Sequence, residues 1–180
     1  MLVWQDEVHF RIQATVAAVW ARKGSRPKVK SYPGRQKASY SGFVIPDSGE
    51  LFAAEPDAFN FETTVSSLRS FLSARPVPPG KRYAIVMDNA SWHRKAFRVI
   101  WEERDPEYDD IRRAAIAVRL PPYSPDLNPI EQVWRITRRE NTHNRFFPSL
   151  EALKEKIGSA FDAWSRPNDQ LRKLCGGKSN

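Results

Sequence analysis

The sequence predicts an α/β domain built on a mixed β-sheet. Two features of the chain support this prediction. Segments with the two-residue alternation of β-strands come first and are joined by turn residues, which favours antiparallel pairing. Short apolar segments then alternate with segments of helical periodicity, which is typical of strands buried on both faces. We therefore expect antiparallel and parallel strands in one sheet.

The antiparallel group is expected at residues 2–12, 37–46 and 50–54, with a turn at residues 47–49 between the last two strands. In the first strand, alternate positions place a set of apolar residues on one face: Leu2, Trp4, Val8, Phe10 and Ile12. Glu7 falls on the opposite, polar face and calls for no special explanation. This pattern predicts a strand with one buried face.

The later elements follow from apolar spacing and from helix-breaking residues. They are a helix at 61–74, a strand at 82–87, a helix at 91–103, a strand at 114–120, a proline-rich loop at 121–129 and helices at 129–141 and 149–164. The length suits one domain, which we expect at residues 1–166. Residues 167–180, which include two adjacent glycines, are expected to form a flexible tail.

The composition narrows the classes of protein to which the chain can belong. No apolar segment approaches the ~20 residues of a membrane helix, and the first residues do not resemble a secretory signal. The single cysteine, Cys175, cannot form an internal disulfide, which fits a reducing cytoplasm. The net charge of +8 and the pI near 9.8 favour a polyanionic partner, of which nucleic acid is the usual example.

Basic residues concentrate in one segment, where every charged residue from 22 to 37 is a lysine or an arginine. They are Arg22, Lys23, Arg26, Lys28, Lys30, Arg35 and Lys37. Prolines and glycines interrupt regular structure there. The segment is either a solvated loop or an arm that contacts DNA phosphates.

Three carboxylates stand at unusual positions. Asp6 lies on the apolar face of the first strand, where a buried carboxylate needs a cation, a hydrogen-bond network or a metal. Asp88 directly follows an apolar strand, and ligands of open α/β sheets bind beyond such strand ends. The simpler alternatives are a salt bridge or a strand-edge position for Asp6, and a helix-capping role for Asp88.

Glu131 falls near the start of a helix, with Asn128 as the expected N-cap and Pro129 at the first helical position. The simpler alternative for Glu131 is therefore a capping-box carboxylate. The apolar stripe of this helix is expected to bury Leu127, Ile130, Val133 and Trp134. The arginines on the face of Glu131 are expected either to pair with it or to contact DNA phosphates: Arg135, Arg138 and Arg139.

Three carboxylates suit a hard cation such as Mg²⁺, which prefers oxygen ligands. Two such ions at one phosphodiester can activate the attacking oxygen and stabilise the leaving one. The histidines and Cys175 lack the spacing of a zinc site. The sequence also lacks the glycine-rich motifs of nucleotide-binding loops and the nucleophile motif of serine hydrolases.

Four motifs in order resemble the DDE catalytic domain of the mariner transposase superfamily, in its bacterial insertion-sequence branch. They are residues 4–7 (WQDE), 20–24 (WARKG), 87–93 (MDNASWH) and 120–134 (LPPYSPDLNPIEQVW). The last motif is long and specific, and the resemblance covers nearly the whole chain. It implies a ribonuclease H-like fold with Asp6, Asp88 and Glu131 as the catalytic, metal-binding carboxylates.

The resemblance also implies the chemistry and the partners. The expected reaction is Mg²⁺-dependent, or Mn²⁺-dependent, hydrolysis at transposon ends, after which the freed 3′-hydroxyl attacks target DNA. Asn89, His93 and Asn128 match motif positions that shape the site without binding metal. Such proteins work as dimers on DNA, with helix-turn-helix modules before the catalytic domain and, in bacteria, in the cytoplasm at the nucleoid.

Two other functions remain open from the sequence. Because Met1 closely precedes Asp6, we expect either a helix-turn-helix module encoded upstream or a truncated remnant that binds DNA without cutting it. Another ribonuclease H-like nuclease, acting on branched DNA, would keep the same metal chemistry.

Overall fold

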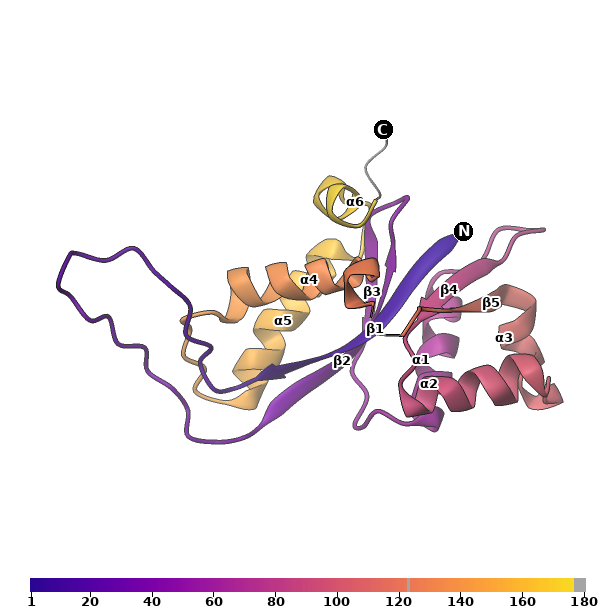
Figure 1. The fold of residues 1–180 in the computed structure, drawn as a ribbon, viewed down its shortest axis with the longest axis horizontal. Helices are drawn as coiled ribbons and strands as arrows, with labels where there is room; N and C mark the ends of the chain where they lie inside the picture. Colours follow the sequence, from indigo (N-terminus) through magenta and orange to yellow (C-terminus); the bar gives the residue numbers. More distant parts are fainter. Residues whose placement is uncertain (123, 177–180) are drawn as a thin grey trace.

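The computed structural model describes residues 1–122 and 124–176, and the strands in that part form one mixed sheet (Figure 1). Its order is β3-β2-β1-β4-β5. The strands are β1 (Leu2–Arg11), β2 (Lys37–Ile45), β3 (Glu50–Ala54), β4 (Tyr83–Met87) and β5 (Ala115–Arg119). Antiparallel pairing joins β1, β2 and β3, and parallel pairing joins β1, β4 and β5. The predicted mixed sheet is confirmed, with β1 at its centre.

Helices cover both faces of the sheet (Figure 1). One face carries α4 (Ile130–Thr137), α5 (Leu150–Trp164) and α6 (Asp169–Cys175), and the other carries α1 (Phe61–Ala74), α2 (Ser91–Ala96) and α3 (Asp109–Ala114). The π-helical segments Phe97–Glu102 and Arg138–Thr142 continue α2 and α4, and short 3₁₀ turns lie at Pro106–Tyr108 and Pro125–Leu127. In the described part of the chain, every helix is too short or too polar to span a bilayer.

Each face of the sheet has its own apolar core. On the face of α4 and α5, Phe10 and Tyr40 meet Phe161 edge to face. On the opposite face, Phe43 stacks on Phe71 with ring centroids 4.7 Å apart. Because β1 runs between two cores, residues on both of its faces are buried or partly buried in its first half. The expectation of a strand with one buried face and one polar face is therefore wrong for the first half of β1, where Val3 and Gln5 are also buried.

The flexible tail expected from residue 167 is wrong for residues 169–175, which form α6. The side chain of Asn168 caps this helix by accepting hydrogen bonds from two backbone N–H groups, and Leu171 and Cys175 are buried. The backbone of Asn168 also donates to Ser48 O at 3.1 Å. Gly49 permits this approach, because a Cβ atom there would lie 2.0 Å from the carbonyl oxygen of Asn168. Residues 177–180 lie outside the described part.

The segment between β1 and β2 has little regular structure and projects from the sheet as an arm, residues 12–36 (Figure 1). Its base is closed by a backbone hydrogen bond of 3.0 Å from Ile12 N to Gln36 O. The side chain of Asn144 holds Ala17 by donating to its carbonyl and accepting from its N–H. The arm is therefore anchored near the end of α4 and exposed beyond it.

Candidate active site

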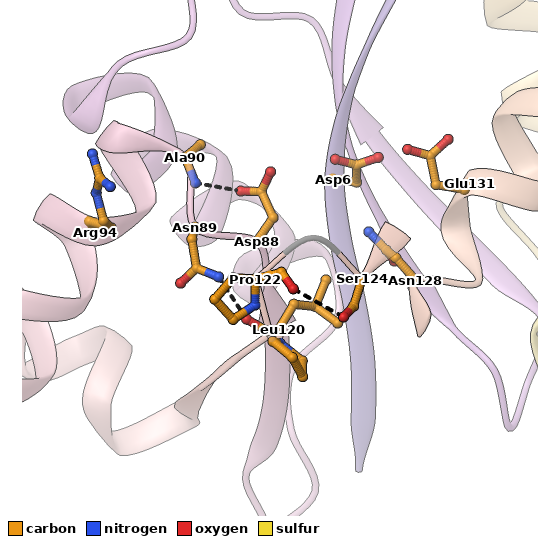
Figure 2. A pocket seen from close by; sticks show the side chains of 11 residues that line it. Asp6, Asp88, Asn89, Ala90, Arg94, Leu120, Pro122, Ser124, Asn128 and Glu131 are labelled. Atoms are coloured by element: carbon orange, nitrogen blue, oxygen red, sulfur yellow. Dashed lines mark hydrogen bonds between the residues drawn. The ribbon is translucent and has the colours of Figure 1, made fainter. Parts of the chain in front are cut away.

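Asp6, Asp88 and Glu131 line one cavity of about 600 Å³ (Figure 2). They arrive from three elements: the middle of β1, the end of β4 and the first turn of α4. The other lining residues come from the segments that follow β4 and β5: Asn89, Ala90, Arg94, Leu120, Pro121, Pro122, Ser124 and Asn128. Asn89 joins these segments by donating from Nδ2 to Leu120 O at 2.7 Å. The cavity therefore lies beyond the carboxyl ends of the parallel strands, as expected.

Asp6 is held by a tryptophan that is distant in sequence. Trp134 Nε1 donates to Asp6 Oδ2 at 3.0 Å. Asp6 pairs with Gly42 across the antiparallel strands, and the indole of Trp134 lies directly against this glycine. A Cβ atom at position 42 would be 2.3 Å from Trp134 Cη2. The missing side chain of Gly42 thus makes room for the ring that donates to Asp6.

Electrostatics on this side of the cavity disfavour the charge of Asp6. Burial raises the pKa of the Asp6 carboxyl to about 7, and the negative charges of Glu131 and Glu7 add to the effect, while the hydrogen bond from Trp134 opposes it. In the described part of the chain, neither Asp6 nor Glu131 forms a salt bridge. The simpler alternative for Asp6, a salt bridge, is therefore not found among the described residues.

Glu131 is not part of a capping box, because α4 begins without a side-chain cap. The predicted cap, Asn128, is buried and lines the cavity instead, and its Oδ1 has no hydrogen-bond partner in the described part. The predicted stripe is confirmed for Ile130, Val133 and Trp134. It is wrong for Leu127, which is 54% exposed because it belongs to the preceding 3₁₀ turn.

Asp88 stands on the other side of the cavity and makes different contacts. Trp4 pairs with Val86 in the parallel register of β1 and β4, so extending that register by two residues places Asp88 beside Asp6. The backbone N–H of Ala90 donates to Asp88 Oδ1 at 2.9 Å (Figure 2). His93 Nδ1 lies 2.6 Å from the same oxygen. The hydrogen bond from His93 holds the pKa of the Asp88 carboxyl below its usual range.

The donor set suits a hard cation, because three carboxylate side chains line one cavity. Figure 2 shows the carboxylates of Asp6 and Glu131 next to each other and that of Asp88 across from them, turned toward Ala90. Among the described residues, no three His, Cys, Asp or Glu side chains cluster closely enough to hold one ion. The structure thus brings the three predicted carboxylates to one cavity but not to one coordination sphere.

Sequence reasoning missed Glu7, which proves to contact His93 rather than solvent. Glu7 Oε1 lies 2.9 Å from His93 Nε2, and the side chain is only 9% exposed. Burial lowers the pKa of His93, but the hydrogen bonds to Asp88 and Glu7 outweigh burial and raise it to about 9. The signal was available: Val3 shares the face of Glu7, so this face of the strand was never wholly polar.

The predicted DNA-contacting residues fall into two groups. Those on the arm are all exposed: Arg22, Lys23, Arg26, Lys28 and Lys30. On α4 and its extension, Arg135 and Arg139 are exposed, but Arg138 is half-buried with its guanidinium 5.6 Å from the centre of the Phe10 ring. The sequence did not single out Arg94, an exposed residue that lines the cavity on the side of Asp88.

Comparisons with known proteins agree on one family. A family model described as "DDE superfamily endonuclease" matches residues 1–154. A Sinorhizobium fredii protein, y4pE/y4sA, is 29% identical over 100 residues, covering 56% of this chain and 64% of its own length. The Shigella sonnei 39 kDa protein of insertion element IS630 is 21% identical over 155 residues, covering 86% and 42%. The chain therefore spans about two fifths to two thirds of the length of these relatives.

A third relative and several solved structures are also similar to this chain. The Tc3 transposase of Caenorhabditis elegans is 45% identical over 56 residues, covering 30% of this chain and 16% of that protein. The Mos1 strand transfer complex superposes with a TM-score of 0.64 at 19% identity, covering 97% of this chain and 50% of that one. Mos1 paired-end complexes with Mn and with Mg have TM-scores of 0.62 and 0.57. These likenesses confirm the predicted ribonuclease H-like fold.

Proposed function

Because the chain belongs to the DDE superfamily endonuclease family, we propose that it is the catalytic domain of a transposase. It would cut phosphodiester bonds at transposon ends and join the freed strand to target DNA. One observation carries the proposal: acidic residues from β1, β4 and α4 converge on one cavity although they are far apart in sequence. A cavity where Asp6 and Glu131 form no salt bridge with the described residues suits a cation-dependent reaction on a polyanion.

The proposed cofactor is Mg²⁺, with Mn²⁺ as the alternative, held by Asp6, Asp88 and Glu131. A divalent ion at this site would supply an electrophile that activates the attacking oxygen and stabilises the leaving one. The adjoining carboxylates of Asp6 and Glu131 support this proposal, because two like charges at the edge of an apolar core are costly without a cation. Solved relatives of the fold with Mn and Mg support it as well.

The residues of the chain would orient the acids and hold their protons. With its pKa near 7, Asp6 keeps a proton for part of the time at neutral pH, and a bound cation would displace that proton. Trp134 Nε1 holds Asp6 Oδ2, which leaves Oδ1 for the cation. The indole and the core behind it also exclude water from this wall of the cavity.

DNA is the proposed partner of the exposed cations on the arm and on α4, since lysine and arginine side chains neutralise phosphates. A second copy of the chain and an upstream-encoded helix-turn-helix module are proposed as further partners. Exposed apolar residues on the arm support contact with a protein partner: Val16, Val19 and Trp20. Acting on chromosomal DNA, the protein would work in the bacterial cytoplasm, at the nucleoid.

Cleavage of a supercoiled plasmid carrying the DNA that flanks the gene on both sides would test the proposal. With Mg²⁺ or Mn²⁺ present, the chain should nick this plasmid, and EDTA should abolish the activity. The variants D6N, D88N and E131Q should each reduce nicking by about 10³-fold or more, since each removes a charge from the proposed ion site. The control E140Q changes an exposed glutamate beyond α4 and should cut like the parent. Equal nicking by D88N and the parent would refute the assignment.

A further inference from the structure

A buried histidine connects Asp88 to Glu7 on the central strand. The side chain of His93 is 0% exposed. Its Nδ1 lies 2.6 Å from Asp88 Oδ1 and its Nε2 lies 2.9 Å from Glu7 Oε1. Ionised carboxylates only accept hydrogen bonds, so both ring nitrogens donate. The ring is thus held at both nitrogens. The position of Glu7 therefore determines where the ring lies, and the ring determines where the carboxylate of Asp88 lies.

Glu7 is itself fixed by the sheet. Gln5 Nε2 donates to Glu7 Oε1 at 2.9 Å and contacts Ser41 Oγ at 3.1 Å. Gln5 and Ser41 are buried at 1% and 3% exposure. A continuous polar chain therefore runs from β2 through β1 to the start of α2, and it ends at the carboxylate of Asp88.

Asp88 needs such support, because its side chain is 46% exposed. A half-exposed aspartate ordinarily samples several rotamers, and fixing one costs conformational entropy. Within the described part of the chain, the hydrogen bonds from Ala90 and His93 both go to Oδ1. They leave Oδ2 available to the cavity.

We propose that Glu7 and His93 are positioning residues, which hold Asp88 in one rotamer so that Oδ2 faces a cation in the cavity. This inference rests on the proposed function, since it assumes that Asp88 binds the cation. Partners behind a ligand commonly change metal affinity by about 10- to 100-fold. A purely structural alternative exists: the pair would only hold α2 on the sheet, and its loss would change stability but not metal affinity.

Mn²⁺ binding to the full chain, measured by electron paramagnetic resonance, distinguishes a positioning role from a purely structural one. E7Q keeps the shape of the side chain but removes the charge that anchors His93. We expect E7Q to weaken Mn²⁺ binding about 10-fold. The matched control is E50Q, a partly buried glutamate of the same sheet that pairs with Arg75 away from the cavity. E50Q should bind Mn²⁺ like the parent, and thermal unfolding in EDTA reports the stability of both variants.

Two amide substitutions of His93 give a second comparison. H93N keeps a donor close to the position of Nδ1, facing Asp88, whereas H93Q keeps a donor close to Nε2, facing Glu7. H93N should therefore bind Mn²⁺ more tightly than H93Q, even if both are less stable than the parent. If both variants fail to fold, E7Q alone decides.

A double variant tests whether Glu7 acts through Asp88 or through its charge beside Asp6. In a D88N background, E7Q should cause no further loss of Mn²⁺ affinity if Glu7 acts through Asp88. An equal loss in both backgrounds would overturn the inference, as would parental affinity in E7Q. If D88N itself binds Mn²⁺ like the parent, the proposed metal site is wrong. If D88N loses affinity while E7Q does not, only the positioning role is wrong.

Discussion

The two sides of the cavity hold their carboxylates in opposite ways. On the side of α4, Asp6 lies in an apolar setting next to Glu131, and its pKa is raised to about 7. On the side of α2, Asp88 is half-exposed and accepts from His93, and its pKa is lowered. The protein thus supplies a cationic partner to one aspartate and withholds it from the other. A cation bound as proposed would therefore offset unfavourable electrostatics mainly at Asp6 and Glu131.

If the site binds a cation as proposed, this difference would make it both stable and ready to bind the ion. Asp88 is fixed by hydrogen bonds that do not depend on the ion, so it remains in place when the site is empty. Asp6 and Glu131 keep an unfavourable charge pair that a divalent ion would relieve. The following substitutions act on one side and leave the other as a reference.

The largest effect on stability is expected from G42A, which disturbs only the Asp6 side. A Cβ atom there would meet Trp134 Cη2 at 2.3 Å, and overpacking a core typically costs about 1–3 kcal/mol of unfolding free energy. Urea unfolding measures the loss. G158A is the control, because nothing lies within 4 Å of a Cβ at this position in α5. If G42A proves as stable as G158A, the close packing of Trp134 on β2 is wrong.

W134F should have the next largest effect, since it keeps an aromatic ring and removes the N–H that donates to Asp6. We expect a loss of about 1–2 kcal/mol. The pKa of Asp6 should rise further, because this hydrogen bond lowers it. Carboxyl NMR titration and urea unfolding measure the two effects. The control is W92F, which removes a buried N–H that has no partner in the described part of the chain. An unchanged Asp6 pKa in W134F would contradict the assigned bond.

In metal-free buffer, D6N and D88N should shift stability in opposite directions. The folded pKa of Asp6, about 7, exceeds its ordinary value of 3.8, so its contribution is complete below pH 4 and is lost as pH rises through 7. D6N should therefore raise the melting temperature by a few degrees at pH 8, at roughly 2–4 °C per kcal/mol. Asp88 has a lowered pKa, which stabilises the fold at pH values above the ordinary pKa of an aspartate. At pH 8, D88N should therefore lower the melting temperature. If D6N and D88N shift the melting temperature in the same direction, the two sides of the cavity do not hold their aspartates in opposite ways.

The smallest effects are expected from the arginines on the two sides. Arg94 lines the cavity near Asp88, and Arg135 is exposed on α4 one turn beyond Glu131. Replacing either with alanine should remove about one phosphate contact. The slope of the logarithm of the DNA-binding constant against the logarithm of salt concentration should then fall in magnitude by about one, and stability should not change. Fluorescence anisotropy at several salt concentrations measures the slope. R69A is the control, because Arg69 pairs with Asp110. A slope that stays parental in R94A would exclude Arg94 from the DNA path.

Local sequence signals predicted most of the fold. Both β3 and α1 begin and end where expected, because their signals are local: a glycine turn precedes β3, and Asn60 with Thr63 forms a capping box at the start of α1. Predictions failed where packing decides the outcome. Leu127 is exposed and Asn128 does not cap α4, since the 3₁₀ turn before α4 directs the two side chains differently from a helix start. The tail is helical at α6 because Leu171 and Cys175 complete a core.

The sequence alone singled out Asp6, Asp88 and Glu131 as candidates, because a carboxylate on an apolar strand and another at a strand end are recognisable within short windows, and an extended motif that resembles a known family marks the third. Only the tertiary structure decided how each is held. The contacts of Trp134 with Asp6 and of His93 with Glu7 join residues 128 and 86 positions apart. No local pattern encodes such contacts, since they arise only when the helices pack on opposite faces of the sheet.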